Sequence, residues 1–230
     1  MTYRTVRTRA GLRMVQHGTV LSEIRKSPGP THSVADEIAS AVHVLVPEST
    51  VALLGFAGGG VLAPLRAMGA SHRICAVDLD DSGYYVFHKL CSSWAGQVTF
   101  EKAEACEWLT NRSRQYRAIV EDLSVPLQKD VVKPDETWSE LPGSIYRRLD
   151  QDGVGIFNLL RPTKFSWHSG FQRLIPEGFD ARLVHFSEFE NRLLIACRTL
   201  PTARQLSRHL GVSLRSINSR LAGRISVRSY

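Results

Sequence analysis

The stretch Val51-Ala-Leu-Leu54, followed directly by Gly55-Phe-Ala-Gly-Gly-Gly60, decides the fold of this 230-residue chain. An apolar run of four residues predicts a short buried strand, and residues 61–68 after the glycines predict a helix. Glycines between a strand and a helix let the backbone turn tightly and approach a ligand closely. A glycine-rich turn also occurs where nothing binds, so its meaning depends on the segments that follow.

A second strand is expected from Arg73 to Leu79, and Asp78 stands near its end, 18 residues after Gly60. In nucleoside-binding Rossmann-like folds, an acid at this place accepts hydrogen bonds from the ribose hydroxyls. An acid at a strand end can also cap the next helix, but Asp80 and Asp81 suit that role better. The glycine turn and Asp78 together predict a nucleoside site, for which NAD remains a candidate at this point.

Strands and helices continue to alternate along the chain, which indicates a parallel sheet with helices on both faces. Further strands are expected at 98–101, 118–121 and 154–159, and helices at 33–46, 84–94, 105–111, 138–149 and 168–175. The last two strands, 181–186 and 192–197, are only five residues apart, too few for a crossover helix. They must form an antiparallel hairpin. We therefore expect an α/β fold with a Rossmann-like, mostly parallel, seven-stranded sheet that ends in an antiparallel hairpin.

Two segments flank this domain. Alternating apolar and polar residues in 11–23, around His17-Gly18, predict an N-terminal β-hairpin. Residues 202–221 have apolar spacing and a glycine typical of a helix-turn-helix, although the segment is short and joins the last strand without a linker. We interpret the chain as a basic N-terminal segment (1–30), a central domain (31–200) and a basic helical tail (201–230).

Charge and composition narrow the class of protein. The net charge is +7, and residues 201–230 hold six arginines and no acidic residue. Basic ends predict weak, non-specific binding of polyanions. The sequence shows no long apolar run that would span a membrane. Its four cysteines, at positions 75, 91, 106 and 197, lack the spacing of a metal site. We expect a cytoplasmic protein without a metal or a membrane partner.

Polar or small residues also follow the third and fourth strands, in Lys102-Ala-Glu-Ala105 and Glu121-Asp-Leu-Ser-Val-Pro126. Ligands of such sheets bind at the carboxyl ends of the strands, near the point where strand order reverses. Four strand ends in succession thus carry a glycine turn, an acid, a small polar turn and another acid. This combination is much harder to obtain by chance than any one of the motifs.

These motifs resemble, in position, those of the spermidine synthase-like branch of the class I S-adenosylmethionine-dependent methyltransferases. That family has GGGDGG after a strand, E-I-D after the next, G-D-A before a helix and D-S-S-D-P after the fourth strand. This chain has Gly55–Gly60, Asp78-Leu-Asp80, Ala103-Glu-Ala105 and Asp122–Pro126 at those places. The resemblance extends from Gly11 to Cys197.

The resemblance implies that S-adenosylmethionine, or a close derivative, is the cofactor, and it assigns residues to the site. Asp78 would bind the ribose, Glu104 and Ala105 would lie at the adenine, and the glycine turn would pass under the methionine part. Asp122 matches the acid that acts on the acceptor. The full set of implied cofactor contacts is Gly55, Phe56, Ala57, Gly59, Gly60, Asp78, Leu79, Glu104, Ala105 and Asp122.

Two departures from the family pattern bear on the reaction. Gly58 stands where the family has the acid of GGGDGG, and Val125 stands where it has the second acid of D-S-S-D. In aminopropyltransferases these acids surround the cationic aminopropyl arm and the diamine. A carboxylate at position 58 would also repel the carboxylate of ordinary S-adenosylmethionine. We therefore favour a methyltransferase acting on a small-molecule amine, hydroxyl or carboxylate.

Other functions stay open. The same donor serves polyamine aminopropyltransferases and other alkyl-transfer or cyclisation enzymes, and degraded motifs are also found in inactive subunits. A DNA-binding regulator with a nucleoside-sensing domain would explain the basic tail. The tail is more simply interpreted as helices that pack on the domain or form a homodimer.

Asp122 is the candidate catalytic residue. A sulfonium methyl group is already activated, so the protein needs mainly to align an acceptor, and a base helps where the acceptor carries a proton. Asp122 could instead be a helix cap or an ion-pair partner. Weaker candidates for the pocket are Asn158, His32, Trp138, Trp167 and His168.

Overall fold

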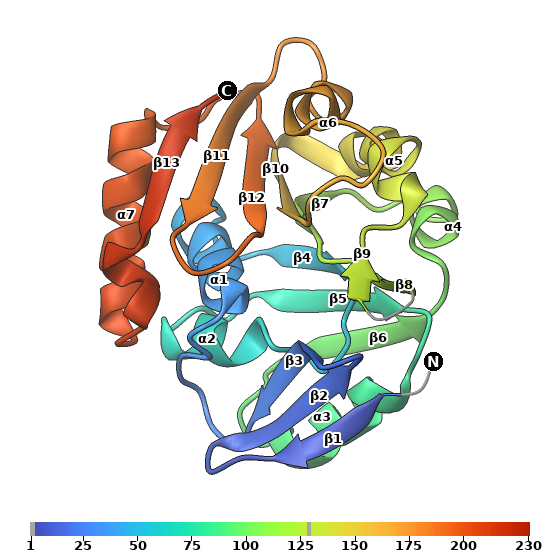
Figure 1. Cartoon of the computed structure of the whole chain (residues 1–230), viewed down its shortest axis with the longest axis vertical. Coiled ribbons are helices and arrows are strands. Elements are labelled where there is room, and N and C mark those ends of the chain that lie inside the picture. The colour runs from blue at the N-terminus through green and yellow to red at the C-terminus, as the bar shows by residue number, and fades with distance from the viewer. Residues whose placement is uncertain (1–2, 128–129) are drawn as a thin grey trace.

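The centre of the molecule is a parallel sheet, as the computed structural model shows over residues 3–127 and 130–230. Its parallel strands run in the spatial order β10 (Leu149–Leu159), β7 (Tyr116–Glu121), β4 (Thr50–Leu54), β5 (Arg73–Asp78) and β6 (Val98–Lys102). β4 is buried along its whole length, because helices cover both faces of the sheet. The chain builds β5 and β6 on one side of β4 and β7 and β10 on the other, so strand order reverses beside β4 (Figure 1).

The sheet continues beyond β10 with antiparallel strands. β11 (Asp180–Phe186) and β12 (Arg192–Cys197) form the expected hairpin, and β12 pairs with β10. Over the described residues the sheet has eight strands instead of the seven expected, because β13 (Ile225–Ser229) adds to the free edge of β11. The stretch that forms β13 was assigned to the helical tail because it follows the helical pattern directly, although its apolar Ile225 and Val227 alternate with polar residues.

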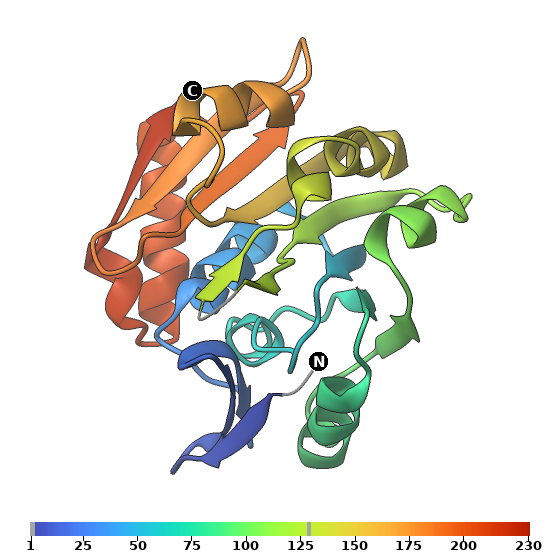
Figure 2. The same cartoon turned by 45° about the vertical axis from the view of Figure 1, so that its right-hand side comes forward.

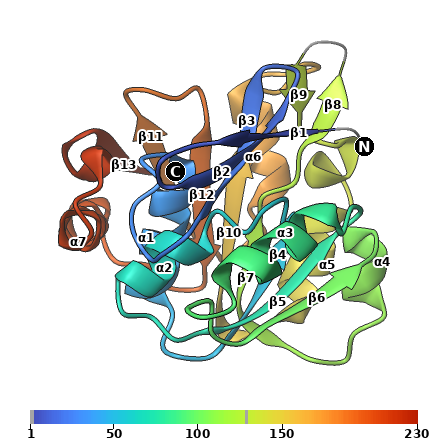
Figure 3. The same cartoon turned by 90° about the horizontal axis from the view of Figure 1, so that it is seen from below.

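Two helical layers enclose the sheet. One layer contains α1 (Val34–Leu45), α2 (Leu62–Ala67), α3 (Ser82–Cys91) and α7 (Ala203–Ser216), which pack into one apolar cluster with one sheet face. The other layer contains α4 (Ala105–Thr110), α5 (Leu141–Arg148) and α6 (Trp167–Leu174), which pack into a second cluster. Seen from below, α7 and α4 lie on opposite sides of the molecule (Figure 3).

The N-terminal segment forms a sheet of its own. The expected hairpin is β2 (Gly11–Gln16) with β3 (Thr19–Arg25), and β1 (Arg4–Arg7) adds a third antiparallel strand. This N-terminal sheet lies at the lower end of the molecule, outside the large sheet (Figures 1 and 2). Met14 and Ile24 are almost fully buried in the core cluster that includes α2 and α3, so the small sheet is part of the domain's packing.

The tail is not a helix-turn-helix. α7 is followed by a single 3-10 turn (Arg220–Gly223) and then by β13. The apolar residues that suggested two crossing helices are instead buried within the chain itself: Leu206, Leu210, Ile217 and Leu221. The tail is also tied to the start of α1, because the Ser219 hydroxyl donates to buried Asp36 over 2.6 Å. The apolar surface that favoured a homodimer is thus covered by the chain's own domain.

A short antiparallel pair, β8 (Val125–Leu127) and β9 (Asp130–Val132), follows β7 and lies above the carboxyl end of the sheet. A 3-10 turn (Asp135–Trp138) connects this pair to α5. None of the helices that the structure describes has the length and apolar character needed to cross a membrane.

Candidate functional site

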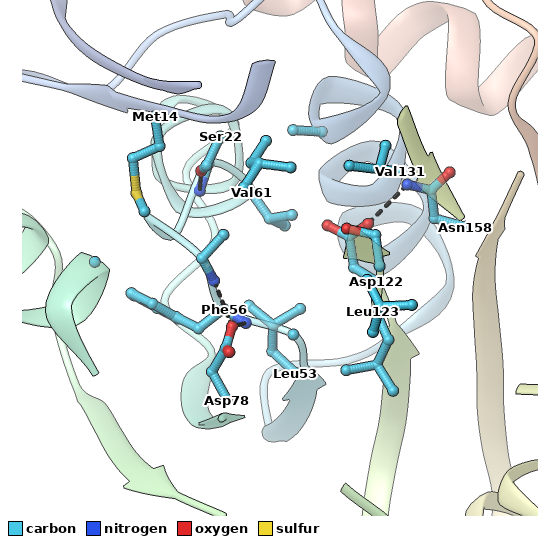
Figure 4. A pocket seen from close by; sticks show the side chains of 18 of the residues that line it. Met14, Ser22, Leu53, Phe56, Val61, Asp78, Asp122, Leu123, Val131 and Asn158 are labelled. Atoms are coloured by element: carbon cyan, nitrogen blue, oxygen red, sulfur yellow. Dashed lines mark hydrogen bonds between the residues drawn. The ribbon is translucent and has the colours of Figure 1, made fainter. Parts of the chain in front are cut away.

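A cavity of about 670 Å³ lies at the carboxyl ends of the parallel strands. This volume is within the range of small-molecule sites, about 300–1,000 Å³. Its floor comes from the residues that follow β4, β5, β7 and β10, and β2 and β3 cover it from one side (Figure 4). The pocket therefore lies where the reversal of strand order opens a crevice.

The glycine turn is held in place by its neighbours. Gly55 has a φ of +87°, and a Cβ there would lie 2.6 Å from the backbone oxygen of Asp122. Any side chain would therefore push apart the two strand ends that form the pocket floor. The Gly60 amide donates to the Ser22 hydroxyl over 3.0 Å, which fixes the turn against β3.

Asp78 holds this turn as well as facing the pocket. Its Oδ2 accepts hydrogen bonds from the amides of Phe56 and Ala57, each at 2.8 Å, and its Oδ1 accepts one from the Asp80 amide at 3.1 Å. Ala57 has a φ of +45°, which is uncommon for a residue with a side chain. The carboxylate that fixes two consecutive amides of the turn therefore also stabilises its backbone geometry. A carboxylate has about four acceptor positions, so some capacity remains for a ligand.

Asp122 is the first member of a short hydrogen-bonded chain. The Asn158 Nδ2 group donates to Asp122 Oδ1 over 2.7 Å, and Asn191 Nδ2 donates to Asn158 Oδ1 over 3.0 Å. All three residues line the pocket (Figure 4 labels Asp122 and Asn158). Burial raises the pKa of Asp122 to about 6, against the lowering effect of the Asn158 hydrogen bond. A carboxyl group with this pKa exchanges protons near neutral pH, as a general base must.

A buried ion pair supports the loop after β7. Lys133 Nζ lies 2.6 Å from Glu121 Oε1, and the side chains of both residues are essentially inaccessible to solvent. Lys133 also donates to the backbone oxygen of Leu123, and Thr137 donates to Glu121. The pair fixes β8, β9 and the segment after them over the strand end that carries Asp122.

Most residues that the sequence assigned to the site do line this pocket. They are Gly55, Phe56, Ala57, Gly60, Asp78, Leu79, Glu104, Ala105 and Asp122. Gly59 is not among the described residues that line the pocket, and a Cβ at this position would lie 2.6 Å from Phe56 Cζ. Glu104 is also the N-cap of α4, because its Oε2 accepts from the Glu107 amide over 2.8 Å.

The other aromatic and histidine candidates lie elsewhere. Trp138 is buried beside Phe165, and His168 contacts the Tyr230 hydroxyl. The Arg192 guanidinium lies over the Trp167 ring, 4.2 Å from its centroid. His32 accepts from the Arg220 amide at the tail. None of these four candidates is among the described residues that line the pocket.

Sequence reasoning missed the residues that reach the pocket from other segments. They are Tyr3, Met14, Gln16 and Ser22 from the N-terminal segment, Val131 and Pro134 near β9, and Asn191 at the start of β12. The one sequence feature that could have pointed to them is the set of polar residues within the apolar pattern of 11–23. The contact of the N-terminal sheet with the glycine turn depends on tertiary packing.

The fold is shared with solved structures of low sequence identity. Sequence comparison finds no matching family model and no matching curated protein. The chain is similar to a spermidine synthase solved in complex with the transition-state analogue AdoDATO, at 13% identity and a TM-score of 0.63, covering 93% of this chain and 74% of that one. The chain is also similar to spermidine synthase from Thermotoga maritima, at 13% identity and a TM-score of 0.60, covering 93% of this chain and 73% of that one.

Methyltransferases share the fold too. Human methyltransferase-like protein 13, in complex with SAH, is similar at 17% identity and a TM-score of 0.57, covering 81% of this chain and 89% of that one. The chain has the class I methyltransferase fold. The two spermidine synthases cover a larger share of this chain than the methyltransferase does. The expected resemblance is thus confirmed at the level of the fold.

Proposed function

We propose that this chain binds S-adenosylmethionine in the pocket and transfers its methyl group to a small acceptor beside Asp122. The observation that carries the proposal is the meeting of the glycine turn, Asp78 and Asp122 in one cavity at the reversal point of the sheet. The neighbouring structures with this fold include a methyltransferase in complex with SAH.

The lining suits such a donor. Asp78 has acceptor capacity left for a ribose hydroxyl. Leu79 lines the pocket with 52% of its surface exposed, and it offers an apolar surface to a base beside Glu104 and Ala105. Gly55 and Gly60 leave room for the methionine part to pass close to the backbone.

The environment of Gly58 favours ordinary S-adenosylmethionine over its decarboxylated form. A Cβ at position 58 would lie 2.6 Å from Ile24 Cγ1 and 2.8 Å from Met14 Sδ. The N-terminal sheet therefore fills the space that an acidic side chain would need. Val125 is an apolar lining residue at the position where the spermidine synthase pattern has an acid. A cationic aminopropyl arm would find no carboxylate at these two positions.

The reaction follows from this arrangement. The acceptor's lone pair attacks the methyl carbon, the carbon–sulfur bond breaks, and its electron pair remains on the sulfur of S-adenosylhomocysteine. Asp122 takes the acceptor's proton where it has one, and Asn158 and Asn191 hold the carboxylate in position. The pocket encloses the reacting groups, which aligns them.

Calorimetry with S-adenosylmethionine, its decarboxylated form, S-adenosylhomocysteine and NAD tests the proposal. We expect the carboxylated donor and S-adenosylhomocysteine to bind best, and no spermidine from the decarboxylated donor with putrescine. Asp78→Ala should weaken donor binding by about 1–3 kcal/mol, while Asp81→Ala, outside the lining, should not. No saturable binding at millimolar donor would refute the proposal.

A further inference from the structure

A second concave site lies on the outer side of the molecule, between α7 and β13. This groove has a volume of about 550 Å³ and shares no described residue with the pocket at the strand ends. One wall is the exposed face of α7, and the other is formed by Ala222, Ile225, Ser226 and Val227. Figure 1 shows α7 and β13 side by side at one edge of the molecule, and the pairing of β13 with β11 holds the strand in place.

The α7 wall carries a row of arginines. Arg204, Arg208 and Arg215 line the groove, and all three are exposed. At 3.6 residues per turn these positions fall on one helix face, and at 1.5 Å per residue the row is about 16 Å long. Gly211 lies between them, where a Cβ would be 3.5 Å from the backbone oxygen of Ala222, so the groove is narrow at this point.

These arginines have no acidic partner among the described residues. Two other arginines of the tail, Arg220 and Arg224, form ion pairs with Glu188. The tail itself holds no acidic residue. The groove therefore concentrates positive charge that the fold does not neutralise, and this charge would attract an anionic ligand.

We propose that this groove binds the phosphate backbone of a double-stranded nucleic acid without reading its sequence. Three charges spaced along a helix match an extended polyanion better than a single phosphate. Ser207 and Ser226 add hydroxyl donors of the kind that contact phosphate oxygens. The described lining contains no aromatic side chain on which an unpaired base could stack, which favours a duplex over a single strand.

The test is fluorescence anisotropy of the full chain with labelled 20-base-pair DNA and RNA duplexes and the matching single strands, from 50 to 200 mM salt. Three phosphate contacts predict a slope of log K against log salt of about −2.7, which is about a 40-fold loss over this range. Replacing Arg204, Arg208 and Arg215 by alanine should lower affinity about 10-fold or more at 50 mM salt and reduce the slope by about 2 to 3. The DNA and RNA arms decide which duplex the groove prefers.

A matched control removes the same charge elsewhere. Arg4, Arg7 and Arg9 are exposed on the N-terminal segment, and their triple alanine variant should stay within about threefold of the wild type. Equal losses in the two triple variants would assign binding to net charge and overturn the proposal. Tighter binding of single strands, or full competition by millimolar inorganic phosphate, would overturn it as well. An unchanged melting temperature shows that each variant is folded.

Discussion

Among single residues, Asp122 connects the geometry of the pocket to its chemistry. Burial raises its pKa to about 6, and the amide of Asn158 fixes its orientation. Only the ionised form accepts a proton, so kcat/KM for an acceptor that must lose a proton should rise with pH and level off above about 6.

Asp122→Asn should lower turnover about 100-fold or more and leave donor affinity within a few-fold, because it keeps the shape and removes the base. The measurements are donor Kd by calorimetry and the rate of S-adenosylhomocysteine release with an acceptor found by screening. An equal loss in affinity and rate would assign Asp122 to the donor instead. Asn191→Ala, which removes only the outer hydrogen bond, should have a smaller effect on the rate.

Glu37 in α1 is a buried acidic residue whose burial is not offset by hydrogen bonds among the described residues. Its side chain is fully buried, and neither carboxylate oxygen has a hydrogen-bond partner among the described residues. Burial raises its pKa well above the ordinary 4.5, and neighbouring Asp36 acts in the same direction. The folded state therefore keeps a proton that the unfolded chain has released above about pH 4.5. The free energy of unfolding must then fall as pH rises above that value.

Glu37→Gln should remove this pH dependence and raise the free energy of unfolding at pH 7, because glutamine carries no proton that the unfolded chain would release. Urea unfolding of the wild type and the variant between pH 4.5 and 8 measures the free energy of unfolding at each pH. Asp122→Asn is the matched comparison, because the raised pKa of Asp122 has the same sign but its contribution ends near pH 6. A Glu37→Gln curve parallel to the wild type would show that Glu37 is charged and solvated in the folded protein.

Among the secondary-structure elements, β8 and β9 are followed by a segment that a buried ion pair ties to β7. The buried pair of Glu121 and Lys133 joins the end of β7 to the segment after β9, and this segment contributes Pro134 and Glu136 to the pocket. Buried pairs add little net stability, but the loss of one partner leaves an uncompensated charge.

Lys133→Met should therefore lower the free energy of unfolding by about 3–5 kcal/mol. The double variant Glu121→Gln with Lys133→Met should recover most of that loss, since the glutamine still accepts from Thr137 and the Leu123 amide. Urea unfolding of the wild type and the variants checks this. If the double variant is no more stable than the single one, the pair does not carry the interaction we assign to it.

In the molecule as a whole, the tail is part of the core. Leu206 and Leu210 are fully buried in the cluster that includes α1, and β13 covers the edge of β11. Deleting residues 201–230 would uncover this apolar surface and leave β11 as an open edge strand. We expect the truncated protein to be insoluble or to unfold at a much lower temperature.

A shorter deletion, of residues 225–230, removes β13 alone and serves as the graded control. It should keep the fold with a lowered melting temperature, because α7 and the Ser219–Asp36 contact remain. Thermal unfolding followed by circular dichroism measures both variants. A folded and fully stable chain without residues 201–230 would show that the tail is an independent appendage.

Much of this architecture could be predicted because it depends on local pattern. Short apolar runs, a glycine turn and helical spacing specify buried strands and their helices, and five residues between two strands exclude a crossover. The order of the motifs placed Asp78 and Asp122 at the same edge of the sheet, where β4 lies between the strands that carry them, since all parallel strands point their carboxyl ends the same way. Apolar runs did not predict the start of β10, whose first half, Asp150 to Gly153, is polar.

The sequence by itself therefore determined the class of fold and the residues at the strand ends, because both follow from periodicity and direction along one chain. Only the tertiary structure decided what contacts these residues from elsewhere. Met14 and Ile24 occupy the space beside Gly58, Asn191 completes the chain to Asp122, and the tail supplies an eighth strand over the described residues. Such contacts join segments far apart in the chain. They are set by the shape of the space left between packed elements, which no local pattern encodes.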